Sequence, residues 1–168
     1  RNDCSVVATV MSVDPDCSPE ITAMIGVSAA IAISDIPWDG PISGVNVGLV
    51  DGQIVINPTL EQRAKSDLVL TVASTADLVA MIEAGGNEID DDTMFDAIMA
   101  GHEENKKIVK FIQGIVDEIG KPKFEYESSN PDPEIMAQIE EFCIEDVKKA
   151  LDTDDKLVRD EALLPIYA

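Results

Sequence analysis

The longest uncharged stretch of the chain lies between Glu20 and Asp35, and it follows Ser18 and Pro19. Serine as N-cap, proline at the first helical position and an acid in the first turn are typical of a helix start. Apolar residues then occupy every side at helical spacing, so the sequence predicts a central helix over 19–33 that is buried on most sides. The uncharged run is too short to cross a membrane.

Alternating and β-branched patterns predict the strands. The first is expected over residues 5–13. A hairpin is expected around Asp51-Gly52, with strands over 45–50 and 53–56, because an Asp-Gly pair between alternating apolar residues favours a tight turn. Residues 60–65 form a short polar connection, and further strands are expected over 67–74 and 78–84.

A long amphipathic helix is predicted from the run Asp90–Asp92 to Gly120, because its apolar residues keep helical spacing. Residues 121–133 are charged, contain proline and serine, and have no periodicity, which is typical of a linker. Two amphipathic helices are expected over 133–151 and 154–164. Hairpins together with long helices indicate the α+β class rather than a doubly wound sheet.

Composition narrows the function classes. The 168 residues carry 33 acids against 12 bases, a net charge of −21, and such a surface repels phosphate backbones unless its cations are gathered. Cys4, Cys17 and Cys143 are odd in number and widely spaced, so disulfides are not expected and a reducing compartment fits. Trp38 lies in a Pro- and Gly-rich connection, where a lone tryptophan more often plugs a core than forms a ligand platform.

No phosphate-binding, dinucleotide or zinc-protease motif occurs. His102 beside Glu103 could form a general base with a carboxylate, but a single histidine within an amphipathic helix is more often a packing residue. Asp90–Asp92 favour dipole complementation at a helix start over metal binding. Glu61 and Asp67 could converge on a metal but lack a third ligand. From the residues alone, this is an acidic α+β segment without an evident active site.

Five segments, in order and at matching spacing, resemble the polynucleotide phosphorylase family: residues 1–14, 23–59, 65–75, 81–85 and 97–104. Among them are A-M-I-G-V-S-A-A-I-A-I-S-D-I-P-W-D-G-P-I-S-G, V-G-L-V-D-G-Q-I-V-I-N-P-T and A-I-M-A-G-H-E-E. The resemblance covers nearly residues 1–125, and residues 130–168 match more loosely. A chain that begins with Arg1 and has a strand pattern at once is expected to be a piece of something longer.

The resemblance implies a fold and a domain division. Residues 1–120 would form the C-terminal part of the first of two RNase PH-like repeats, a ribosomal protein S5 domain 2-like half-domain with a mixed sheet packed on a long buried helix. Residues 121–133 would be a linker, and 134–168 the start of an all-helical domain. The N-terminal half of that repeat and its arginine-bearing loops would lie outside this chain.

The resemblance also implies an activity for the intact protein: processive 3′-to-5′ phosphorolysis of RNA, releasing nucleoside diphosphates with Mg²⁺ or Mn²⁺. It implies a cytoplasmic homotrimeric ring, RNA and phosphate as partners and an RNA-decay assembly, with neither membrane nor DNA. The phosphate-binding serines and metal-binding aspartates of the family belong to the second repeat. Glu61 and Asp67 share the spacing of an aspartate pair there, but the residues between them differ.

We therefore expect no catalytic and no metal-binding residue in this segment, and which residues would contact RNA is left open. Two other interpretations remain at this stage. One is a non-catalytic acidic module that binds a protein partner. The other is an RNase PH-type nucleotidyltransferase that trims transfer RNA, against which the G-P-I sequence after the first helix argues.

Overall fold

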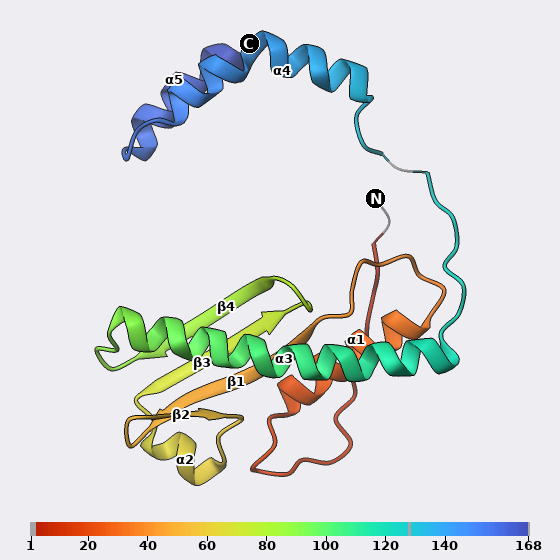
Figure 1. The fold of residues 1–168 in the computed structure, drawn as a ribbon, viewed down its shortest axis with the longest axis vertical. Coiled ribbons are helices and arrows are strands. Elements are labelled where there is room, and N and C mark those ends of the chain that lie inside the picture. Colours follow the sequence, from red (N-terminus) through yellow and green to blue (C-terminus); the bar gives the residue numbers. More distant parts are fainter. Residues whose placement is uncertain (1–2, 128, 168) are drawn as a thin grey trace. The chain divides into compact units, whose positions relative to one another are not determined.

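The structure is a computed structural model that describes residues 3–127 and 129–167 (Figure 1). The chain divides into two compact units, the first from Asp3 to Tyr126 and the second from Glu127 onward. Arg1, Asn2, Ser128 of the expected linker and Ala168 of the expected helical domain lie outside the described residues. The elements are α1 (Pro19–Ile33), β1 (Ser43–Val50), β2 (Gln53–Ile56), α2 (Leu60–Lys65), β3 (Leu68–Ser74), β4 (Val79–Gly86), α3 (Asp91–Ile119), α4 (Pro133–Leu151) and α5 (Lys156–Tyr167).

One four-stranded sheet, in the order β2-β1-β3-β4, forms the centre of the first unit. All three ladders are antiparallel, so the α+β class is confirmed but the expected mixed sheet is wrong. Hairpins join β1 to β2 and β3 to β4, and hairpin-connected neighbours are antiparallel, while β3 returns antiparallel beside β1 after β2 and α2. Asp51 and Gly52 adopt positive φ values of 51° and 74° in the β1–β2 turn, as a twisted two-residue hairpin requires.

Helix α3 crosses the strands and covers one face of the sheet (Figure 1). The core beneath it is a cluster from β1, β3 and α3: Val45, Val47, Leu68, Leu70, Val72 and Ala97. The α3 backbone approaches the sheet closely at Gly101. A Cβ added there would lie 2.9 Å from Cγ2 of Val72 and 3.1 Å from Cγ2 of Val47. Glycine therefore sets how closely the helix approaches the strands.

Helix α1 begins as its sequence indicates, with the Ser18 hydroxyl accepting from the backbone N–H of Ile21 at 3.3 Å. The expectation that it is buried on most sides is wrong, because only Ile21, Ser28 and Ala32 are buried. Apolar residues on every side show that the helix could be buried on any side. They do not show how many of its sides the rest of the fold covers.

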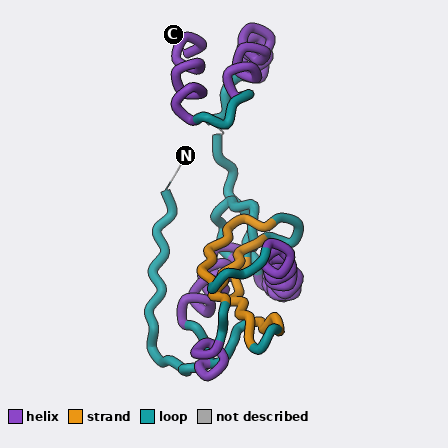
Figure 2. The backbone as a smooth tube through the Cα atoms, turned by 90° about the vertical axis from the view of Figure 1, so that its left-hand side faces the viewer, coloured by secondary structure: helices purple, strands orange, loops and turns teal. Residues whose placement is uncertain are grey.

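Two local expectations are corrected in the first 65 residues. Residues 5–13 form no strand and are exposed, and Figure 2 shows them as a loop that leads into α1. Strand pairing needs a partner for the backbone groups, and none of the four described strands pairs with this segment. Residues 60–65, expected as a connection, form α2, because Thr59 and Gln62 make a reciprocal capping box.

The end of α1 is held by a distant part of the chain. Its last turn carries no basic residue, so its carbonyl groups lack a local cation. The Lys123 ammonium supplies one, donating to the carbonyl oxygens of Ala32 at 2.7 Å and Ser34 at 2.6 Å. The backbone N–H of Lys121 adds a bond to the Ile33 carbonyl at 3.0 Å. The segment after α3 is thereby fixed against α1.

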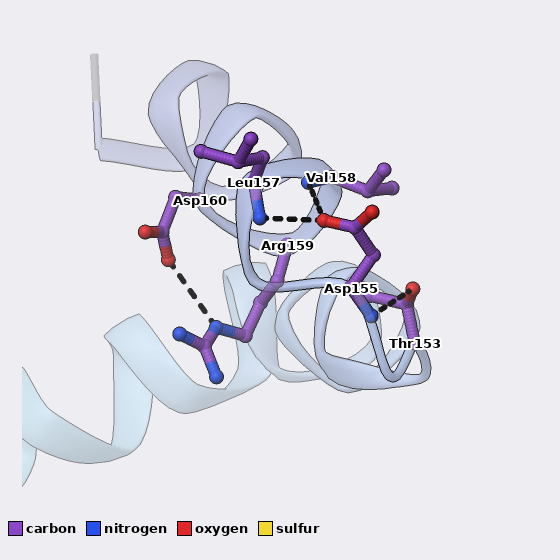
Figure 3. Close-up of polar contacts among 6 residues, drawn as sticks. All are labelled: Thr153, Asp155, Leu157, Val158, Arg159 and Asp160. Atoms are coloured by element: carbon purple, nitrogen blue, oxygen red, sulfur yellow. Dashed lines mark hydrogen bonds and ion pairs between the residues drawn. The ribbon is translucent and has the colours of Figure 1, made fainter.

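The second unit is a pair of helices, α4 and α5. Asp132 caps α4 and accepts from the Glu134 N–H at 2.8 Å. Asp155 does the same for α5, accepting from the N–H of Leu157 at 2.8 Å and of Val158 at 3.3 Å (Figure 3). Both helices were predicted, and each begins where an aspartate satisfies unpaired N–H groups. No helix of the described residues is both long and apolar enough for a membrane crossing.

We predict that Gly101→Ala destabilises the first unit by about 1–2 kcal/mol in urea unfolding, because the new methyl group must displace buried valines. The matched control is Gly114→Ala in the same helix, where an added Cβ meets nothing within 4 Å. That change should stabilise by about 0.5–1 kcal/mol through helix propensity. Equal effects at the two positions would show that α3 does not approach the sheet through Gly101.

Candidate functional site

His102 and Glu103, the candidate acid–base pair, point into different surroundings. His102 is 5 % exposed on the buried side of α3, and its Nδ1 has no hydrogen-bond partner among the described residues. Glu103 is exposed and accepts from the Lys106 ammonium at 2.6 Å. That hydrogen bond and the Lys106 charge lower the pKa of Glu103. The structure therefore does not assemble a general base with its carboxylate here.

Asp90 uses its carboxylate to start α3. Its Oδ1 accepts from the Thr93 N–H at 2.9 Å, and its Oδ2 accepts from the Thr93 hydroxyl at 2.7 Å. The hydrogen bonds to Thr93 are the main cause of the lowered pKa of Asp90. Asp91 and Asp92 follow, exposed, in the first turn. The aspartate run lies at the start of α3, where it complements the helix dipole as the sequence indicates, and the structure adds that Asp90 is the helix cap.

Glu61 and Asp67 stand at the two ends of α2. Glu61 is exposed in its first turn. Asp67 follows the helix and accepts from the Asn87 side-chain amide at 3.4 Å. Among the described residues, no group of three His, Cys, Asp or Glu side chains is placed to hold a metal ion. The donor set that a divalent cation needs is therefore not provided by this part of the chain.

The remaining candidates are also accounted for. Cys4 and Cys17 are exposed free thiols, and Cys143 is a half-buried one whose Sγ donates to the Ile139 carbonyl at 3.1 Å. The Trp38 ring is 37 % exposed and lies against Gly40, where an added Cβ would be 2.4 Å from the ring. Trp38 thus covers a backbone turn.

Some polar residues that organise the structure were missed from the sequence. Asn105 is fully buried and donates from Nδ2 to the Val72 carbonyl at 2.9 Å. Ser43 and Ser74 are also fully buried. An amide on the apolar side of a predicted helix was the available signal for Asn105. Thr59 and Gln62, three apart, were the signal for the capping box of α2.

Residues 3–13 and the outer edge of strand β4 are open to a partner. Residues 3–13 are exposed, with Val7 85 % and Met11 89 % accessible. Strand β4 pairs with β3 alone and so lies at the edge of the sheet, with Met81 and Ile82 about half exposed. An extended apolar segment and an unpaired strand edge are the features that add strands to a sheet.

A known protein family and individual proteins match this chain. Residues 40–104 match a family model described as "3' exoribonuclease family, domain 2". A polyribonucleotide nucleotidyltransferase of Ruminiclostridium cellulolyticum is 55 % identical over 160 residues, which cover 95 % of this chain and 23 % of that protein. Over nearly its whole length, this chain is similar to a segment of proteins named polyribonucleotide nucleotidyltransferase.

A second relative of that name, from Geobacillus kaustophilus, is 49 % identical over 168 residues, covering 100 % of this chain and 23 % of the relative. The chain thus spans about a quarter of the length of the curated relatives it matches. Among solved structures, rice Rrp46 aligns with a TM-score of 0.55 at 15 % identity, over 62 % of this chain and 51 % of that one. At that identity the likeness shows the fold.

We predict that Asp90→Ala lowers the free energy of unfolding at pH 7, and that this loss shrinks as the pH falls below about 4. Because folding lowers the Asp90 pKa, the carboxylate stabilises above its unfolded pKa, and the effect is lost on protonation. Urea unfolding across pH measures both parts. Asp92→Ala in the same turn is the control. It should change stability less, because it removes only the interaction of a carboxylate with the helix dipole. Identical pH profiles for the two variants would contradict the capping role.

Proposed function

We propose that this chain is a structural, non-catalytic segment of a phosphate-dependent 3′-to-5′ exoribonuclease. In the proposed reaction, phosphate attacks the 3′-terminal phosphodiester of RNA and releases a nucleoside diphosphate. The observation that carries the proposal is identity of about 50 % over nearly the whole chain to proteins named polyribonucleotide nucleotidyltransferase. Those names favour this activity over an RNase PH-type transfer RNA trimming enzyme.

The geometry of the polar residues supports a structural role for the segment. Asp90 caps α3, Glu103 pairs with Lys106, and Glu61 and Asp67 lack a third metal donor among the described residues. These side chains do not provide the set of oxygen donors that the divalent cation expected of the intact enzyme would need. The net charge of −21 also opposes binding of a phosphate backbone by this segment.

The exposed residues 3–13 and the outer edge of β4 support the proposal that this chain forms part of a larger sheet. We propose that residues 3–13 pair as a strand with chain outside these 168 residues. An exposed apolar segment with strong β-propensity gains both backbone hydrogen bonds and buried surface from such pairing. The division into an RNase PH-like domain over 1–120, a linker over 121–133 and a helical domain from 134 is part of the same proposal.

The finer features of the intact enzyme belong to the proposal as well. They are a homotrimeric ring in the cytoplasm, Mg²⁺ or Mn²⁺ as cofactor, and RNA and phosphate bound by other parts of the protein. In this arrangement the segment contributes to the wall of the ring and holds a neighbouring catalytic repeat. An RNA-decay assembly is a further proposed partner.

A phosphorolysis assay tests the function. The longer protein that contains this segment should release ADP from poly(A) in the presence of phosphate and magnesium, and residues 1–168 alone should release none. Chromatography of the products separates ADP from AMP, so a hydrolytic nuclease is distinguished from a phosphorolytic one. Omitting phosphate is the control and should abolish ADP release.

The two parts of the proposal fail separately. Phosphate-dependent ADP release by residues 1–168 would overturn the structural role of the segment. Release of AMP alone, or of no nucleotide, by the longer protein would overturn the phosphorolytic activity. In that case the acidic protein-binding module would become the better interpretation of the charge.

A further inference from the structure

Two serines lie side by side under helix α3. Ser43 of β1 and Ser74 of β3 are direct partners in the antiparallel ladder, and both are fully buried. By the alternation of side chains along a strand, they share a face with Val45 and Val72. That is the face of the sheet that packs against α3.

Helix α3 places two polar residues over the same region. Gly101 lies against Val72, and one turn later Asn105 donates from Nδ2 to the Val72 carbonyl at 2.9 Å. Val72 is two residues from Ser74 on the same face. His102 precedes Asn105 by three residues, and is therefore its neighbour on the buried side of the helix.

Each of these four residues has a buried polar atom without a hydrogen-bond partner among the described residues: Ser43 Oγ, Ser74 Oγ, Asn105 Oδ1 and His102 Nδ1. Buried polar atoms in native proteins are almost always paired, with protein or with ordered water. The four unpaired atoms lie on three elements that pack together, β1, β3 and α3.

The chemistry of the four atoms defines what could pair with them. The two serine hydroxyls can donate, Asn105 Oδ1 accepts, and Nδ1 of a neutral His102 accepts in the tautomer that carries its proton on Nε2. A water molecule accepts two hydrogen bonds and donates two. We propose that one internal water accepts from Ser43 and Ser74 and donates to Asn105 and His102, joining β1, β3 and α3 at a tetrahedral site.

The site specifies the state of the histidine. Because Nδ1 accepts from the water, the proton of the neutral ring lies on Nε2. This tautomer can be observed directly, since His102 is the single histidine of the chain. The inference concerns the packing of α3 on the sheet and holds whether or not the proposed activity does.

Nuclear magnetic resonance tests the site on residues 1–168. Long-range ¹⁵N–¹H correlations at pH 8 should show His102 as the Nε2–H tautomer. Cross-peaks from a long-lived water to the amide protons of Ser43 and Ser74 should also be present. Protonation of Nδ1, or the absence of water cross-peaks in the folded protein, would overturn the proposal.

Substitutions give an independent readout. Ser74→Ala removes one donor and should reduce the folded-to-unfolded equilibrium constant about tenfold. Adding Ser43→Ala should abolish the water cross-peaks and cost less than a second tenfold, because both serines bind the same water. Ser12→Ala, at an exposed serine, is the control and should leave cross-peaks and stability unchanged. Neutral effects of both buried substitutions would show that the serines bind no water.

Discussion

The fold of the first unit depends on the close approach of α3 to β1 and β3. A residue without a side chain at Gly101 lets the helix backbone lie directly over Val47 and Val72. That distance allows Asn105 to reach a strand carbonyl and closes the core cluster over the sheet. A larger residue would move the helix outward, and packed interiors do not tolerate even one extra methylene without strain.

Local signals predicted those parts of the fold that local interactions determine. The Asp51-Gly52 turn, the Ser18 cap and the start of α3 at Asp90 were all readable, because each is satisfied within a few residues. Strand 5–13 was wrong because a strand is stable only beside another, and pairing is not a local property. Helix α2 was missed because its six residues are too polar for a hydrophobic period, so only its capping box marked it.

The candidate site shows the same limit. Sequence reasoning placed the Asp90–Asp92 run at the start of α3 as a dipole complement, and it gave His102 a packing role that its burial supports. It could not find the buried polar residues Ser43, Ser74 and Asn105. Ser74 and Asn105 are 31 and 62 positions from Ser43 along the chain. Only the register of β1 with β3 and the path of α3 bring them together. The proposed function, in contrast, rests on the long resemblance rather than on any local motif.

The hydrogen bonds that Lys121 and Lys123 donate to the end of α1 close a loop of the chain at its two ends. Everything from Ser34 to Gly120, including the whole sheet and α3, leaves and re-enters through this one point. A polypeptide loop whose two ends are joined in this way can change length or sequence at its far side without altering what lies outside it. The far side of the loop, such as the β1–β2 turn, can therefore be altered, whereas β1 and α3 cannot be exchanged as one piece because α1 packs against both.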